Sequence, residues 1–111
     1  MTAARDPQSV VERQLDAYNA HDLDAFLATY APEVVVHRRD GSVREGAEAL
    51  GDTYRDQFAA GRCRAEISGR LVEGEWVVDH ETAYGITEEP IRLLVAYRVR
   101  DGLIDQVRFL A

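Results

Sequence analysis

Two carboxylates, Asp79 and Glu81, lie two residues apart in a segment with the alternating pattern of a β-strand. Successive side chains of a strand point to opposite faces, so Asp79 and Glu81 share one face and His80 lies on the other. A carboxylate that is buried in an apolar cavity has a raised pKa and can act as a general base. Either residue is therefore a candidate base. The alternative is an ion pair that only compensates charge.

A shift of one residue in strand register would bring a different pair of side chains inward. His37 and His80 have matching parity in two strand-like segments, and a one-residue slip would turn both toward the interior. Two facing histidines could move a proton or contribute to a metal site. Three widely separated histidines and the single Cys63 make no recognised metal spacing, so we expect no metal. No glycine loop for phosphates or nucleotide motif is present, and we expect no cofactor.

Aromatic side chains recur on the stripes that should face the interior: Tyr18, Tyr30, Tyr54, Phe58, Tyr97 and Phe109. Buried phenol groups need hydrogen-bond partners, so several of them around one cavity would form an apolar wall with polar tips. Gln14 points toward the core on the helical wheel, where its amide could contact a ligand or a neighbouring backbone. We therefore expect Gln14, Tyr30, Tyr54, Phe58, Tyr97 and Phe109 to contact a ligand, although a purely structural core is the alternative.

The elements that would position these side chains begin with helices. Asp6-Pro7 signals a helix start, and residues 1–6 before it should fray. Asp22 can cap a second helix that runs to Tyr30 and is ended by Pro32. Ala47 to Ala60 fits a third helix, which Gly61 would stop.

The second half of the chain has the periodicity of strands. Residues 33–38 form a first strand, and four longer ones follow at about 63–72, 75–84, 91–100 and 103–110. Asp101-Gly102 is a two-residue hairpin signal. No helix separates the last four strands, so they must pair antiparallel. Helices followed by a meander predict an α+β domain, with the helices packed on one face of a curved sheet.

The composition fits one acidic domain spanning residues 1–111. The chain has 13 Lys+Arg against 20 Asp+Glu, a formal charge of −7. Phosphate binding requires a positive surface, so we expect no nucleic-acid partner. The longest uncharged apolar run, Leu93 to Tyr97, has five residues, whereas a membrane span needs about 20. Without a signal-peptide pattern, and with one cysteine, we expect a cytoplasmic protein.

Several segments together resemble the nuclear transport factor 2-like superfamily, closest to SnoaL-like and ketosteroid isomerase-like bacterial proteins. The matching segments are YNAHDLDAF at 18–26, YAPEV at 30–34, residues 46–58, and YRVRDGLI at 97–104 with VRFL at 107–110. The resemblance implies a cone in which three N-terminal helices close over a curved, mostly antiparallel sheet around a pocket. It also implies a homodimer formed through the outer sheet face.

The superfamily frame has consequences for individual residues. It places Asp79, Glu81 and Arg38 on the pocket side, where the Arg38 guanidinium could stabilise a developing enolate or alkoxide. The positions of the ketosteroid isomerase tyrosine, base and oxyanion acid fall on Gln14 and Arg38 and near Val95, so that mechanism is not retained.

Three functions of different kind remain open, because one fold hosts many activities. The first is a cofactor-independent isomerase, cyclase or dehydratase acting on a small apolar molecule. The second is a non-catalytic binder of such a molecule, and the third is a homodimeric association module.

Overall fold

The computed structural model of the chain describes residues 5–111. Helix α1 spans Pro7–Ala20, and the Asp6 carboxylate caps it by accepting a hydrogen bond from the Ser9 amide at 2.8 Å. Residues 1–4 of the predicted frayed terminus lie outside the described residues, while Asp6 is held in place by this cap.

Helix α2 (Leu23–Leu27) ends earlier than predicted. The Thr29 carbonyl accepts a hydrogen bond from the Ile104 amide at 2.9 Å, and Tyr30 pairs with Ile104 as the first residue of a strand. Sheet pairing therefore overrides the helical periodicity that extended to Tyr30. Pro32 lies where the strand register shifts, so its missing N–H costs no regular ladder bond.

Helix α3 (Ala47–Ala60) has the predicted bounds, and Gly61 ends it with a φ of 68°. Six strands form one sheet in the order β2-β1-β6-β5-β4-β3. Their bounds are β1 Tyr30–His37, β2 Val43–Glu45, β3 Arg64–Glu73, β4 Trp76–Tyr84, β5 Ile91–Arg100 and β6 Leu103–Phe109. The last four pair antiparallel, as predicted, whereas β1 and β6 pair in parallel.

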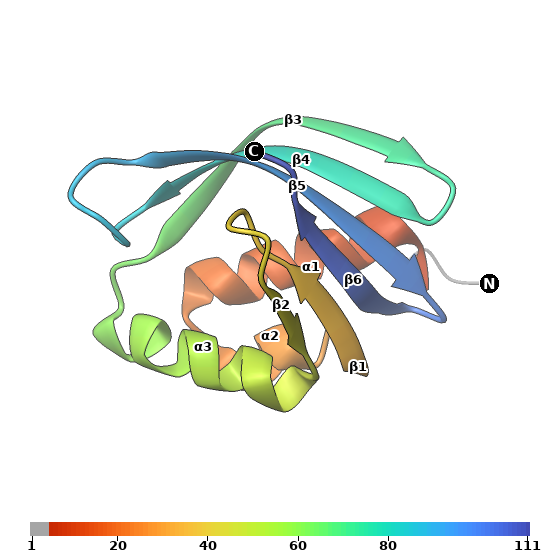
Figure 1. Cartoon of the computed structure of the whole chain (residues 1–111), viewed down its shortest axis with the longest axis horizontal. Helices are drawn as coiled ribbons and strands as arrows, with labels where there is room; N and C mark the ends of the chain where they lie inside the picture. Colours follow the sequence, from red (N-terminus) through yellow and green to blue (C-terminus); the bar gives the residue numbers. More distant parts are fainter. Residues whose placement is uncertain (1–4) are drawn as a thin grey trace.

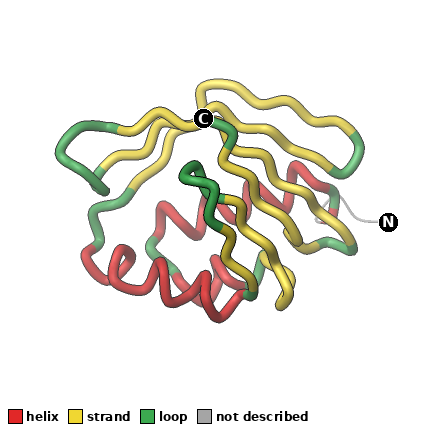
Figure 2. Tube along the Cα trace, in the orientation of Figure 1, coloured by secondary structure: helices red, strands yellow, loops and turns green. Residues whose placement is uncertain are grey.

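The three helices cover one face of this curved sheet, with α1 and α3 lying beneath the arch of the strands (Figures 1 and 2). The α+β cone is thus confirmed. Between the layers lies an aromatic core in which the Phe26 ring is 5.1 Å from the rings of both Tyr30 and Tyr54. No helix in the described part of the chain is long and apolar enough to span a membrane.

Candidate functional site

The register of the sheet decides which side chains face the helices. Glu81 pairs with Leu93 on β5, and both side chains line a cavity inside the cone. His80 alternates with Glu81 and therefore lies on the outer face, where its Nε2 is 2.9 Å from Nη2 of Arg92. His37 pairs with Arg108, next to the inward pair Val36 and Val107. The alternative register with inward histidines is therefore wrong.

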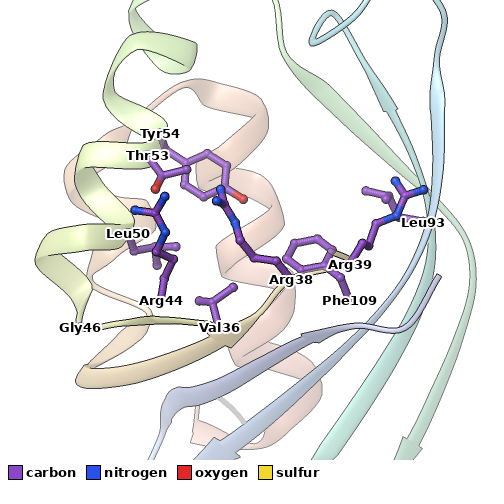
Figure 3. A pocket seen from close by; sticks show the side chains of 10 residues that line it. All are labelled: Val36, Arg38, Arg39, Arg44, Gly46, Leu50, Thr53, Tyr54, Leu93 and Phe109. Atoms are coloured by element: carbon purple, nitrogen blue, oxygen red, sulfur yellow. The ribbon is translucent and has the colours of Figure 1, made fainter. Parts of the chain in front are cut away.

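Two adjoining cavities lie between the sheet and the helices. The first, the tyrosine chamber, has a volume of about 130 Å³, and its lining includes Gln14, Tyr18, Tyr30, Tyr54, Glu81 and Tyr97. The second, the arginine chamber, has a volume of about 200 Å³, and its lining includes Arg38, Arg39, Arg44 and Thr53 (Figure 3). Five residues line both chambers: Val36, Leu50, Tyr54, Leu93 and Phe109.

Glu81 is the ionisable group of the tyrosine chamber. Burial raises the pKa of its carboxyl to about 7, and the negative charge of Asp79 adds to the shift. No ion pair or hydrogen bond joins the Glu81 side chain to another residue within the described range 5–111. A carboxyl with these properties gains and loses a proton near neutral pH and is free to approach a ligand.

The surrounding phenols remain protonated. Burial and, to a smaller extent, the nearby Glu81 charge together raise the pKa of Tyr54 to about 12, while Arg38 opposes the shift. Burial is also the main cause of the raised pKa values of Tyr30 and Tyr97, with a smaller contribution from Glu81. A neutral phenol donates a hydrogen bond, so these side chains can face a carbonyl or an oxyanion.

Asp79 does not face the ligand, contrary to one of the two expectations for the base. Its side chain is 2% exposed, and both of its oxygens accept hydrogen bonds from Arg70, at 2.6 Å from Nε and 2.9 Å from Nη2. Arg70 also donates to the Glu12 carboxylate at 2.9 Å, which ties β3 to α1. Because Arg70 donates to both of its oxygens, Asp79 has a structural role and is not the candidate base.

A β-bulge explains why Arg70 points inward. The register of β3 against β4 shifts between Ile67 and Gly69, so one extra residue reverses the alternation beyond it. Regular alternation from Ile67, which lies opposite the inward Glu81, would put Arg70 on the outer face. Gly69 was the available signal, because a glycine inside a strand often marks a bulge.

Arg38 faces the interior, as expected, but it does not join the carboxylates. It follows Val36 on the inward side of β1 and lines the arginine chamber with Arg39 and Arg44. Figure 3 shows Arg38 and Arg44 extending toward α3, and Arg39 extending toward Leu93. Among the described residues, no ion pair links Arg38 to Asp79 or Glu81.

Five of the six residues expected to contact a ligand line the tyrosine chamber: Gln14, Tyr30, Tyr54, Tyr97 and Phe109. Phe58 does not, because its ring is packed edge-on against Phe26 at 5.2 Å and Tyr18 at 5.4 Å in the core. Arg39 and Arg44 were missed. The Asp40-Gly41 turn was the signal, since a hairpin there brings Arg44 opposite Val36.

The donor set does not resemble a metal centre. Across residues 5–111, no three His, Cys, Asp or Glu side chains gather where they could hold an ion. His21 caps the C-terminus of α1, and its Nε2 lies 2.6 Å from the carbonyl oxygen of Cys63. The ionisable groups that line the two chambers are Glu81, the phenols and the arginines.

Three helices and a curved sheet that enclose a pocket, with one carboxyl and several phenols inside, define a class of cone-shaped α+β folds. Residues 11–107 match the family model of the SnoaL-like domain. The chain belongs to the SnoaL-like domain family, within the nuclear transport factor 2-like fold. No curated protein sequence matches it.

Solved structures with little sequence identity share this fold. An NTF2-like protein of unknown function from Cytophaga hutchinsonii superposes with a TM-score of 0.85 at 15% identity, covering 98% of this chain and 92% of that one. RV0760c from Mycobacterium tuberculosis, in complex with estradiol-17beta-hemisuccinate, gives 0.81 at 22% identity, with 95% and 92% covered. An LEH-like epoxide hydrolase from M. tuberculosis gives 0.75 at 22% identity, with 90% and 77% covered. At these identities the likeness shows the fold alone.

Proposed function

We propose that this protein binds a small, largely apolar molecule in the cone and, without a cofactor, moves a proton from one atom of that molecule to another. Glu81 is the general base that takes up the proton. One observation carries the proposal: Glu81 lines the tyrosine chamber with no protein partner in the described residues, and its pKa is raised to about 7. A base is most effective when its pKa lies near the working pH. The steroid complex of RV0760c supports an apolar ligand in this type of cone.

The reaction class follows from the groups that surround the carboxylate. Ionised Glu81 removes a proton from the carbon next to a carbonyl, and the electron pair moves to the carbonyl oxygen as an enolate. The phenols of Tyr54 and Tyr97 donate hydrogen bonds to that oxygen. The proton then returns from Glu81 to another carbon in an isomerisation, or to a departing hydroxyl in a dehydration. In a cyclase, the enolate carbon instead attacks the carbon of a second carbonyl in the same molecule, and the oxygen of that carbonyl takes up the proton from Glu81.

Deuterium exchange tests the base without knowledge of the natural substrate. The bicyclic ketone 2-tetralone is incubated in D₂O at pD 8. The hydrogens next to its carbonyl should exchange about 100-fold faster in the presence of the wild-type protein than in buffer alone. This factor is at the low end for general-base catalysis, because the probe is not the natural substrate. Glu81→Gln should return the rate to that of buffer, as followed by NMR.

A matched control distinguishes catalysis by the carboxylate in the pocket from catalysis by carboxylates on the protein surface. Glu73→Gln makes the same chemical change at an exposed position of β3 and should leave the exchange rate unchanged. An unaltered rate in Glu81→Gln would contradict the assignment of the base. If 2-tetralone binds but the wild-type protein gives no acceleration, the protein is a non-catalytic binder.

A further inference from the structure

Three arginines line the arginine chamber, and none of them forms an ion pair with a carboxylate of the described residues. Arg38 and Arg39 precede the Asp40-Gly41 turn, and Arg44 lies opposite Val36 on β2. No hydrogen bond or ion pair joins their guanidinium groups to any residue that the structure describes. Clustered like charges repel one another, so this arrangement lacks the compensation that grouped cations in proteins usually have.

Several of the other arginines in the chain have such partners. Arg55, Arg64, Arg70, Arg98 and Arg100 each form an ion pair with a carboxylate. The chain offers 20 acidic residues, so a shortage of counter-charges does not explain the unpaired cluster. Asp40 is the acidic side chain of the turn itself, and its Oδ1 accepts hydrogen bonds from the amide and hydroxyl of Ser42 at 2.8 and 2.6 Å. These hydrogen bonds and, to a smaller extent, the charge of Arg38 lower the pKa of Asp40, but no ion pair joins the two side chains.

The sizes of the chambers indicate that one ligand occupies both. Ligand pockets usually have volumes of about 300–1,000 Å³. The two chambers, of about 130 and 200 Å³, reach that range only when a single molecule extends through both. Tyr54, Leu93 and Phe109 line both chambers and would pack against the middle of such a molecule.

Charge then determines the orientation of the ligand. Ionised Glu81 repels an anionic group from the tyrosine chamber, whereas the guanidinium groups attract one to the arginine chamber. Arg39 and Arg44 are exposed, so an end group held there can exchange with solvent. Arginine is the residue best suited to carboxylate or phosphate groups, because its planar fork can donate two parallel hydrogen bonds.

We infer that the ligand of this pocket is an anion, with an apolar body in the tyrosine chamber beside Glu81 and a carboxylate, sulfonate or phosphate end group held by Arg38, Arg39 and Arg44. This inference rests on the proposed function, because it names the class of molecule on which Glu81 would act. The anionic end would fix the position of the carbon presented to Glu81.

Two probes that differ only in charge test the inference. Naphthalene-2-carboxylate and naphthalene-2-carboxamide have the same apolar body. Calorimetric titration at low salt should show the carboxylate binding about tenfold more tightly, since hydrogen bonds between charged groups contribute more than neutral ones. In Arg38→Gln/Arg44→Gln, the preference for the carboxylate should fall well below tenfold, because only Arg39 remains to attract it, and the affinity for the amide should stay as in the wild type.

The control is Arg62→Gln/Arg108→Gln, which removes the same two positive charges at exposed positions outside both chambers. It should keep the preference for the carboxylate. Equal affinities for both probes in the wild type, or an equal loss of both in the double variant, would overturn the inference. If the wild-type protein still binds the amide in that case, the proposed binding of an apolar molecule in the cone remains supported without the anionic end group. A failure of both probes to bind would count against the proposed function and, with it, the inference.

Discussion

Replacing Arg70 by methionine should lower the free energy of unfolding by about 3–5 kcal/mol, the cost typical of removing one partner from a buried ion pair. The Arg70 side chain is 14% exposed and that of Asp79 is 2% exposed, so the substitution leaves a buried carboxylate without its counter-charge. It also removes the link to Glu12 on α1. Urea denaturation at pH 7 measures the effect.

Two further variants make this test specific. Arg64→Met removes an exposed pair with Glu66 on the same strand and should cost less than about 1 kcal/mol. Arg70→Met/Asp79→Leu replaces the buried pair by apolar side chains and should recover most of the lost stability, because the unpaired charge is gone. A single Arg70→Met variant as stable as the wild type would contradict the structural role of the pair.

Replacing Glu81 by glutamine should stabilise the protein above neutral pH, an effect opposite in sign to that of Arg70→Met. The folded pKa of Glu81 is raised from 4.5 to about 7, so the wild-type protein loses stability as the pH rises through this interval. Glutamine has no proton to lose. At pH 8 the variant should therefore exceed the wild type by about 3 kcal/mol, from 1.36 kcal/mol per unit of pKa difference.

The pH dependence distinguishes this charge effect from a change in packing. Near pH 4 both side chains are neutral, and the two proteins should unfold at nearly the same urea concentration. The difference should then grow between pH 4.5 and about 7 and stay constant above that interval. A stability difference that is independent of pH would mean that Glu81 ionises normally in the folded protein.

Local signals were sufficient to predict most of the fold. The cap at Asp6, the glycine stop at Gly61 and the Asp101-Gly102 turn act within a few residues, and the corresponding elements have the predicted bounds. Where pairing between residues far apart in the sequence determines the secondary structure, the prediction was wrong or incomplete. Tyr30 pairs with Ile104 far along the chain, and the three exposed residues of β2 are too few to show a strand period.

The alternation of side chains within a single strand was sufficient to predict part of the site. Parity within β4 put Asp79 and Glu81 on the same face, and both point inward. Their different environments depend on Arg70, and the bulge that turns Arg70 inward reverses the parity of its strand. The arginine chamber depends on β2 folding back against β1, which parity within a single strand does not reveal.

Glu81 should change its charge near neutral pH inside the cone. The most direct test is a ¹³C NMR titration of the side-chain carboxyl groups in protein labelled at glutamate, with the Glu81 signal assigned by its absence in Glu81→Gln. We expect a titration midpoint near pH 7, because burial and the charge of Asp79 oppose ionisation. A midpoint near 4.5, the ordinary value for glutamate, would contradict it.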